Sequence, residues 1–176
     1  MSVPEYPGCS LRCKSDGSIC GDYGECSFVS VFNNLISRRC SSINKRCQYY
    51  DHLEPISKET VRRLIENSVQ HGLACCYCGE RMQLTTSRDN FRMAISIDHK
   101  VPISDKGTND ISNLQVCCTR CNLVKGTMKE KHFVFFIDML IQHFGREEML
   151  EWLEDAFKHA QAYKIQRNQV EEVSKP

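Results

Sequence analysis

The sequence predicts an α+β protein in which two short strands and one short helix form a small core, flanked by helices and preceded by a cysteine-rich extension. Three observations predict this class. Two Cys-x-x-Cys pairs, beginning at Cys75 and Cys118, enclose a stretch whose apolar residues alternate as in a β-strand. On both sides of that stretch, apolar residues recur at helical spacing instead. The first 26 residues combine cysteines with turn formers and cannot build a core unaided.

The chain of 176 residues divides by composition into three regions. Residues 1–50 form the cysteine-rich extension with a basic helix, residues 51–131 contain both cysteine pairs and the core, and residues 132–176 form a helical pair. The net charge is only +1, but residues 27–50 contain four basic and no acidic residues, whereas residues 132–176 contain five bases and eight acids. An anionic partner is therefore expected to bind a local basic patch.

The first region is predicted to contain one helix after its turn-rich start. Helical spacing begins at Ser27 and holds to Arg39, and the sequence leaves open whether the helix continues to Tyr49. The second half of this segment is basic. The apolar residues that recur at helical spacing are Phe28, Val31, Phe32, Leu35 and Ile36.

The second region opens with another predicted helix. Ser57, which follows Pro55, is a suitable N-cap, because a serine side chain can accept a hydrogen bond from a free backbone N–H of the first turn. The helix is expected to end before Gly72. Its apolar stripe consists of Val61, Leu64, Ile65 and Val69.

Two strands and a short helix are predicted in the rest of this region. Residues Met93–Ile97 alternate between apolar and smaller side chains, which predicts a half-buried strand. The polar stretch Ser104–Ser112 is expected to form a surface loop, and Asn113–Val116 a short returning strand. A short helix from Cys118 to about Lys125 follows, so that two strands and a helix enclose the second cysteine pair.

The third region is predicted to be a pair of helices that supports the core. Gly145 separates two apolar stripes and is expected to break the helix there. The first stripe contains Phe133, Phe136, Ile137, Leu140 and Phe144, and the second contains Met149, Leu153, Ala156, Phe157 and Ala160.

The two Cys-x-x-Cys pairs predict a structural zinc site with four thiolate ligands, Cys75, Cys78, Cys118 and Cys121. A two-residue spacer lets both sulfurs of a pair face one ion. Four protein ligands leave no open coordination position, so such a zinc would stabilise the fold. Two alternatives stay open: neighbouring cysteines allow other registers, and all of these thiols could simply be buried. The neighbouring cysteines are Cys76 and Cys117.

The N-terminal cysteines are harder to interpret. Four of them could close a second zinc site, although their spacings fit no single standard pattern. Cys40 and Cys47 lie seven residues apart, on one helix face, and could simply pack there. Disulfides would need an oxidising compartment, for which nothing in the sequence argues. The four candidate ligands are Cys9, Cys13, Cys20 and Cys26.

Between the pairs, three residues suggest hydrolytic chemistry. Asp98 and His99 are adjacent at the end of the predicted strand, and Asn122 lies on the helix that follows. Oxygen ligands such as those of Asp98 and Asn122 favour Mg²⁺, and an imidazole can take a proton from water near neutral pH. Together these groups indicate metal-assisted hydrolysis of a phosphodiester.

The same stretch resembles the HNH endonuclease family, in the form whose ββα-metal site carries a four-cysteine zinc. The resemblance covers residues 75–126. It consists of Cys-x-x-Cys-Gly, Asp-His-x-x-Pro-x-Ser, Asn-Leu-Gln and Cys-x-x-Cys-Asn-x-x-Lys-Gly, in that order. It implies a metal-dependent enzyme that hydrolyses DNA and leaves 5′-phosphate and 3′-hydroxyl ends.

By this resemblance, Asp98 and Asn122 would bind a catalytic Mg²⁺ or Mn²⁺, and His99 would be the general base. Asn113 would hold the following loop and so orient His99. The sequence departs from the family in two places. Lys106 precedes Gly107 where the family often has two glycines, and Asn122 stands where many members have a histidine.

DNA is the expected partner, and six basic residues are predicted to contact it. The rival hypothesis is a non-catalytic zinc module that binds nucleic acid or protein, and a third is a structural zinc protein without nucleic acid. A pure binding module would need the cysteines but not Asp98, His99 and Asn122. The predicted DNA contacts are Arg38, Arg39, Lys45 and Arg46, with Arg120 and Lys125 on the short helix.

The longest apolar run, Phe133–Phe136, is far shorter than the roughly 20 residues that span a bilayer. The sequence also shows no basic segment followed by an apolar stretch at its start. The expectation is therefore an intracellular protein, cytoplasmic or nucleoid-associated, with no membrane contact. The oligomeric state is left open.

Overall fold

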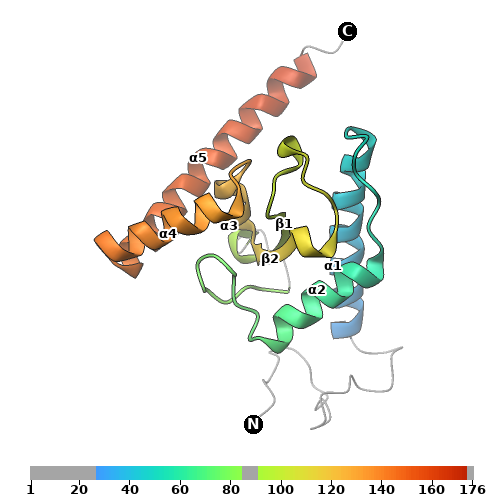
Figure 1. Ribbon diagram of the computed structural model, residues 1–176, viewed down its shortest axis with the longest axis horizontal. Coiled ribbons are helices and arrows are strands. Elements are labelled where there is room, and N and C mark those ends of the chain that lie inside the picture. Colours follow the sequence, from blue (N-terminus) through green and yellow to red (C-terminus); the bar gives the residue numbers. More distant parts are fainter. Residues whose placement is uncertain (1–26, 85–90, 174–176) are drawn as a thin grey trace.

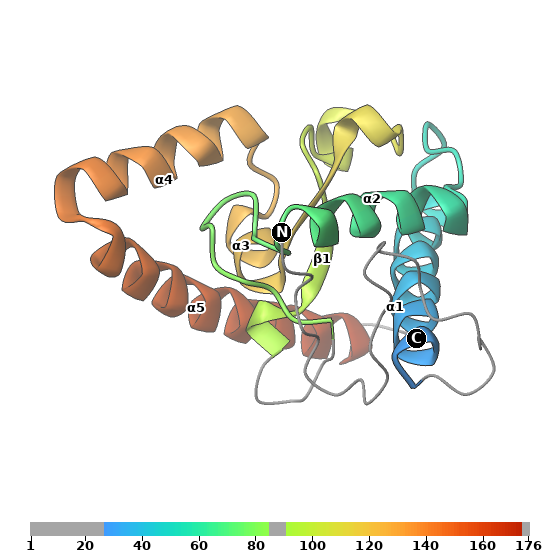
Figure 2. The ribbon, with the colours of Figure 1, turned by 90° about the horizontal axis from the view of Figure 1, so that it is seen from below.

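The computed structural model describes residues 27–84 and 91–173. A two-stranded sheet lies between two groups of helices, α1 and α2 on one side and α3, α4 and α5 on the other (Figure 1, Figure 2). The four N-terminal cysteines predicted as a second zinc site lie outside the described residues. The elements are α1 (Ser27–Asn44), α2 (Lys58–Gln70), β1 (Ile95–His99), β2 (Leu114–Cys118), α3 (Thr119–Lys125), α4 (Glu130–Phe144) and α5 (Arg146–Val173).

Helix α1 is longer than the shorter of the two helices that the sequence allowed, which ended at Arg39. It runs to Asn44, and a 3-10 turn, Lys45–Gln48, continues it almost to Tyr49. The longer alternative is therefore confirmed. The α1 side chains that face the core include Phe32, Leu35, Ile36, Cys40 and Ile43.

The connection between α1 and α2 is fixed by hydrogen bonds. The Oδ1 atom of Asn44 accepts from the backbone N–H of Ile56 at 2.8 Å, and its Nδ2 atom donates to the carbonyl of Ile56 at 3.0 Å. Ser57 caps α2 as predicted, because its Oγ atom accepts from the N–H of Thr60 at 3.0 Å. The two helices therefore form one unit packed against the sheet.

The sheet is antiparallel, with Ile95 opposite Cys118 and His99 opposite Leu114. Strand β1 begins two residues later than the prediction, because Phe91–Met93 forms a 3-10 turn. The prediction of a half-buried strand was also wrong: all five β1 residues are buried, since helices pack against the sheet. Asp98 and His99 consequently lie within the strand and are held by its ladder.

The loop between the strands lies at the surface as predicted, but two of its residues are buried. Gly107 is buried, and a Cβ atom there would lie 1.8 Å from the carbonyl oxygen of Val101, so that no other residue fits. Asn109 is also buried. Lys106, at the position where the family often has glycine, adopts a left-handed conformation with φ of 63°. Most positions of the loop are therefore exposed, as predicted, while Gly107 and Asn109 attach it to the core.

The C-terminal helical pair forms as predicted. Gly145 separates α4 from α5 with φ of 91°, a backbone conformation that favours glycine. Helix α5 runs beside both α3 and α4 (Figure 1, Figure 2). Within the described ranges, no helix has both the length and the apolar character needed to cross a bilayer. The residues of the pair that enter the main core are Phe133, Ile137, Leu140, Met149 and Leu153.

Candidate active site

The two Cys-x-x-Cys pairs meet at the junction of β2 and α3. The Sγ atoms of Cys75, Cys78, Cys118 and Cys121, here called the cysteine cluster, all lie within 4.8 Å of one another and are buried. A tetrahedral zinc with bonds of about 2.3 Å needs sulfurs about 3.8 Å apart. The Sγ atoms of Cys78 and Cys118 are 4.0 Å apart. The donor set and its spacing therefore fit a four-thiolate zinc site.

Backbone groups support negative charge on these sulfurs. The N–H of Cys118 donates to the Sγ atom of Cys75, and the N–H of Cys121 donates to that of Cys118, each at 3.3 Å. Hydrogen bonds from Cys118 and Cys121 lower the pKa of Cys78 to about 7. Gly79, with φ of 70°, lets its own N–H return to the carbonyl of Cys75 at 2.9 Å. The first pair thus forms a closed turn that favours thiolates.

The neighbouring cysteines stay outside the cluster. Cys76 is exposed at the surface, whereas Cys117 is fully buried. The neighbouring thiols of Cys117 and Cys75 raise the pKa of Cys76. Among the cysteine pairings that the sequence allows, the structure brings together the one in which Gly79 directly follows the first Cys-x-x-Cys pair.

Two residues of helix α5 hold the surroundings of the cysteine cluster in place. The Nη2 atom of Arg146 donates to the carbonyl of Cys78 at 2.8 Å. Arg120 binds Glu80 at 2.6 Å and Glu154 of α5 at 3.5 Å, and only 5% of its side chain is exposed. The predicted contact of Arg120 with a phosphate does not fit this placement, because both of its Nη groups already bind carboxylates and the side chain does not face solvent.

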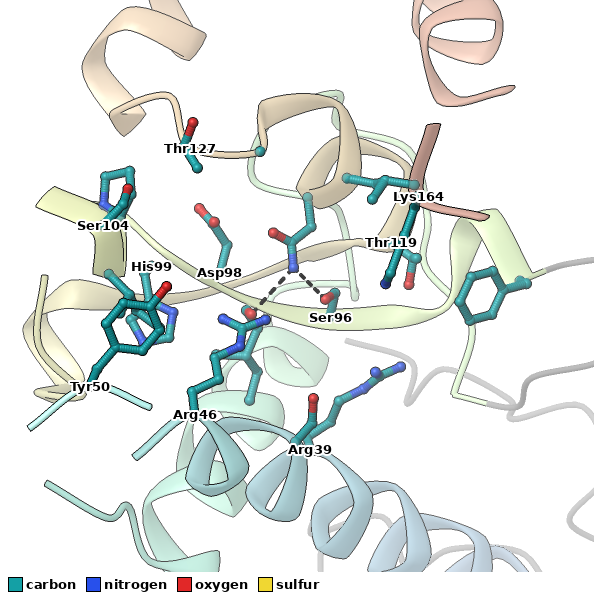
Figure 3. A pocket seen from close by; sticks show the side chains of 18 residues that line it. Arg39, Arg46, Tyr50, Ser96, Asp98, His99, Ser104, Thr119, Thr127 and Lys164 are labelled. Atoms are coloured by element: carbon teal, nitrogen blue, oxygen red, sulfur yellow. Dashed lines mark hydrogen bonds between the residues drawn. The ribbon is translucent and has the colours of Figure 1, made fainter. Parts of the chain in front are cut away.

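A cleft of about 540 Å³ opens along β1. Side chains from α1, β1, α3 and α5 contribute to its lining. Figure 3 shows Arg39 of α1 and Arg46 of the following 3-10 turn extending toward the strand, while Lys164 enters from α5. The cleft brings together groups from positions far apart in the sequence. The lining includes all three residues expected to carry the chemistry, Asp98, His99 and Asn122.

Asp98 is held from its buried side by three donors. Its Oδ1 atom accepts from the Nζ atom of Lys125 at 3.0 Å, and its Oδ2 atom accepts from the hydroxyl of Tyr77 at 2.6 Å and from Gln115 at 3.3 Å. Burial and the charge of Asp98 raise the pKa of Tyr77, so the phenol stays protonated and donates. A carboxylate offers about four lone pairs, so Asp98 can still bind a cation in the cleft.

Lys125 has a different role from the predicted one. Its side chain has no exposed surface, and its ammonium binds both the carboxylate of Asp98 and, at 2.9 Å, the backbone carbonyl of His99. A phosphate contact by Lys125 does not fit this placement. The buried ammonium instead neutralises and orients Asp98.

Asn122 presents its oxygen to the cleft. Its Nδ2 atom donates to the Oγ atom of Ser96 at 2.6 Å and lies 3.3 Å from the carbonyl of Ile97, which can only accept (dashed lines in Figure 3). These contacts identify which atom of the Asn122 amide is the nitrogen and which is the oxygen. Among the described residues, none donates a hydrogen bond to Oδ1. The amide oxygen is therefore free to act as a ligand for a hard cation.

His99 is 4% exposed and borders the cleft. Burial lowers the pKa of His99, so the imidazole is neutral near pH 7 and can accept a proton. Asn113 holds the following loop, since its Oδ1 atom accepts from the N–H of Val101 and its Nδ2 atom donates to the carbonyl of Thr108, each at 2.8 Å. It does not touch His99 directly. The side chain that does so is Asn109, whose Oδ1 atom lies 2.8 Å from Nε2.

The basic residues of α1 and of the 3-10 turn that follows it divide into two pairs. Arg39 and Arg46 line the cleft, whereas Arg38 and Lys45 are exposed and do not line it. The Nε atom of Arg39 is buried, and no described residue accepts a hydrogen bond from it. Burial also lowers the pKa of Arg39, although a guanidinium remains charged. Only one pair of the predicted patch therefore faces the candidate active site.

Sequence reasoning missed several residues of the site. Tyr77 lies inside the first Cys-x-x-Cys turn and Gln115 directly follows Asn-Leu, so both were within the matched motifs. Lys164 carries no motif signal, because its position depends on the packing of α5. Asn109 could have been singled out only if its loop had been predicted as buried.

The HNH endonuclease family model matches residues 75–127 of the chain. No curated protein matches it, and no solved structure does. The matched region contains the sheet, α3, the cysteine cluster and the three candidate residues of the cleft. The predicted resemblance is therefore confirmed: the chain contains an HNH domain with a four-cysteine cluster that fits zinc.

Proposed function

We propose that the protein is a metal-dependent endonuclease that hydrolyses phosphodiester bonds of DNA and leaves 5′-phosphate and 3′-hydroxyl ends. The observation that carries this proposal is the convergence of Asp98, His99 and Asn122 on one cleft that also receives Arg39 and Arg46. The family match supports nuclease chemistry in general.

Asp98 and Asn122 would hold a Mg²⁺ or Mn²⁺ ion. One carboxylate and one amide oxygen form a hard, incomplete ligand set that leaves positions for water and phosphate. When bound, the ion would stabilise charge on the scissile phosphate and on the leaving 3′ oxygen. Lys125 and Tyr77 keep the carboxylate in a fixed orientation before any ion arrives.

His99 is the proposed general base. Its burial keeps the imidazole neutral near pH 7, so that a ring nitrogen can take the proton of the attacking water. Arg39 and Arg46 supply positive charge on the opposite wall of the cleft.

The cysteine cluster has a structural role in this proposal. Its four thiolates would complete a zinc site and leave no position for substrate. A non-catalytic zinc module would need this cluster alone. It would give no reason for a carboxylate, a free amide oxygen and a neutral imidazole to line the same cleft, so the nuclease is the better supported of the two.

The test is the incubation of purified zinc-loaded protein with supercoiled plasmid, with Mg²⁺, Mn²⁺ or EDTA. The parent should nick the plasmid only with a divalent ion. His99→Ala should keep the fold, the zinc and DNA binding while cleavage falls by about 10²- to 10⁴-fold, as expected for the loss of a general base.

His143→Ala is a matched control, because His143 is an exposed histidine of α4 whose ring contacts the carbonyl of Met139 and the ring of Phe144, both in its own helix. It should cleave like the parent. A folded, zinc-loaded parent that binds DNA but shows no ion-dependent nicking would contradict the proposal.

A further inference from the structure

The loop between the strands contributes a buried amide that contacts the proposed base. The Oδ1 atom of Asn109 lies 2.8 Å from the Nε2 atom of His99, and the two residues are 8% and 4% exposed. Water therefore has little access to this contact. Whether Nε2 donates or accepts depends on which way the amide of Asn109 faces.

The second contact of Asn109 decides the orientation of its amide. The Nδ2 atom lies 2.7 Å from the backbone carbonyl of Glu54 and 3.5 Å from the Sγ atom of Cys47. A carbonyl oxygen can only accept a hydrogen bond, so the atom that faces Glu54 must be the nitrogen. The amide oxygen then faces His99.

The orientation of the amide fixes the tautomer of His99. The Oδ1 atom of Asn109 can only accept, so Nε2 must carry the proton. A neutral imidazole carries one N–H, and the lone pair is therefore on Nδ1. No described residue donates a hydrogen bond to Nδ1.

We infer that Asn109 is a positioning residue that holds His99 in the Nε2–H tautomer and so presents Nδ1 as the proton acceptor. This inference rests on the proposed role of His99 as the base. The same hydrogen bond persists after proton transfer, because Nε2 carries its proton in both states. The ring therefore need not turn during the reaction.

The support for Asn109 comes from outside the matched family region. Glu54 and Cys47 belong to the connection between α1 and α2, which precedes residues 75–127. That connection is itself fixed by the hydrogen bonds of Asn44 with Ile56. The N-terminal helices thus contribute to the orientation of the base as well as to the wall of the cleft.

The test is NMR of the full-length, zinc-loaded protein labelled with ¹⁵N-histidine, at a pH where His99 is neutral. The spectrum of His99→Ala identifies the two ring signals of His99 among the six histidines. In the parent, Nε2 should show the shift of a protonated nitrogen and Nδ1 that of an unprotonated one. Asn109→Leu, similar in size but without the acceptor, should give a mixture of both tautomers.

The rate of DNA cleavage should depend on the tautomer of His99. For Asn109→Leu we expect kcat to fall by about 10- to 100-fold with little change in KM for DNA, because the base is misplaced while the DNA contacts remain. Asn109→Asp keeps an oxygen toward Nε2 and should retain the Nε2–H tautomer and more activity than Asn109→Leu. Thr108→Val, which removes only the two exposed hydrogen bonds of the Thr108 hydroxyl with Asp110 in the same loop, should match the parent.

Two results would overturn the inference. One is a parent spectrum with the proton on Nδ1, which decides the matter even if Asn109→Leu does not fold. The other is a folded Asn109→Leu protein whose His99 keeps the parent tautomer. If the parent shows the expected tautomer but cuts no DNA, the positioning by Asn109 stands and the proposed nuclease function fails.

Discussion

The cysteine cluster lies at one end of the strand pair, the cleft runs along β1 past its other end, and the two sites are built in opposite ways. Cys118 pairs with Ile95 at one end of β1, and His99 pairs with Leu114 at the other, about 13 Å away along the strand. The cluster consists of four identical ligands that are all buried within 4.8 Å of one another. The cleft combines different groups, each held by its own protein partners and open to solvent on one side.

This difference separates two tasks. A closed set of four thiolates leaves an ion no free position, so its binding energy contributes to folding. An open set with one carboxylate and one amide oxygen leaves room for substrate, so its binding energy is available for chemistry. Variants of the two sites should therefore fail in different ways.

The largest effect is expected in the cysteine cluster. Cys78→Ser should lose the zinc and unfold, because binding of a structural zinc contributes about 10–16 kcal/mol, comparable with the total stability of a domain. Elemental analysis and thermal unfolding followed by circular dichroism measure both losses.

Cys76→Ser is the matched control for that variant, since Cys76 is adjacent in sequence but exposed and outside the cluster. It should keep the zinc and melt close to the parent temperature. A folded Cys78→Ser protein with no zinc would show that the cluster does not hold the fold together.

An intermediate effect is expected in the cleft. Asn122→Ala should stay folded and zinc-loaded but lose cleavage by more than the roughly 10- to 100-fold that loss of an outer-shell partner costs, because it removes a proposed ligand itself. Raising Mg²⁺ or substituting Mn²⁺ should restore part of the activity. Titration of the divalent ion in the plasmid assay measures this rescue.

His99→Ala serves as the comparison for that titration, because the proposed base binds no ion. It should show no rescue at any ion concentration. Equal rescue of both variants would mean that Asn122 and His99 do not have the distinct roles proposed here.

The smallest effect is expected from the wall of the cleft. Arg39→Ala with Arg46→Ala should lower the salt dependence of DNA binding by nearly two units on a log–log plot, about 0.9 for each phosphate that the protein no longer neutralises. Arg38→Ala with Lys45→Ala removes the same charge from the same segment, α1 and the 3-10 turn that follows it, but these side chains do not line the cleft. This second pair should change the slope less. Identical slopes would indicate that α1 acts only through its overall charge.

Local signals were enough to predict much of the fold. The cap at Ser57, the break at Gly145 and each Cys-x-x-Cys pair depend on spacings of a few residues, and the match between the two pairs was enough to predict their grouping. The same holds for the Asp98-His99 pair. Residues whose partners are near in sequence can be assigned without knowing the tertiary structure.

The errors concern residues whose surroundings come from distant parts of the chain. Lys125 was predicted to contact phosphate, but Asp98 and the carbonyl of His99, both more than 25 residues away, bury its ammonium. Asn109 lies in a loop predicted to be exposed, and Glu54 and His99 enclose it. Strand β1 was predicted too early because the alternation of Met93 with Ile95 continues the pattern of a strand through a 3-10 turn.

One turn of α3 joins the two regions. Cys121 and Asn122 are consecutive, so a ligand of the cysteine cluster and a proposed ligand of the cleft lie about 1.5 Å apart along the helix axis. No intervening segment could absorb a movement of one without moving the other. A chain newly made in a cell short of zinc would therefore lack a formed cleft as well as a stable fold. The supply of zinc would then determine when the proposed catalytic ion can bind.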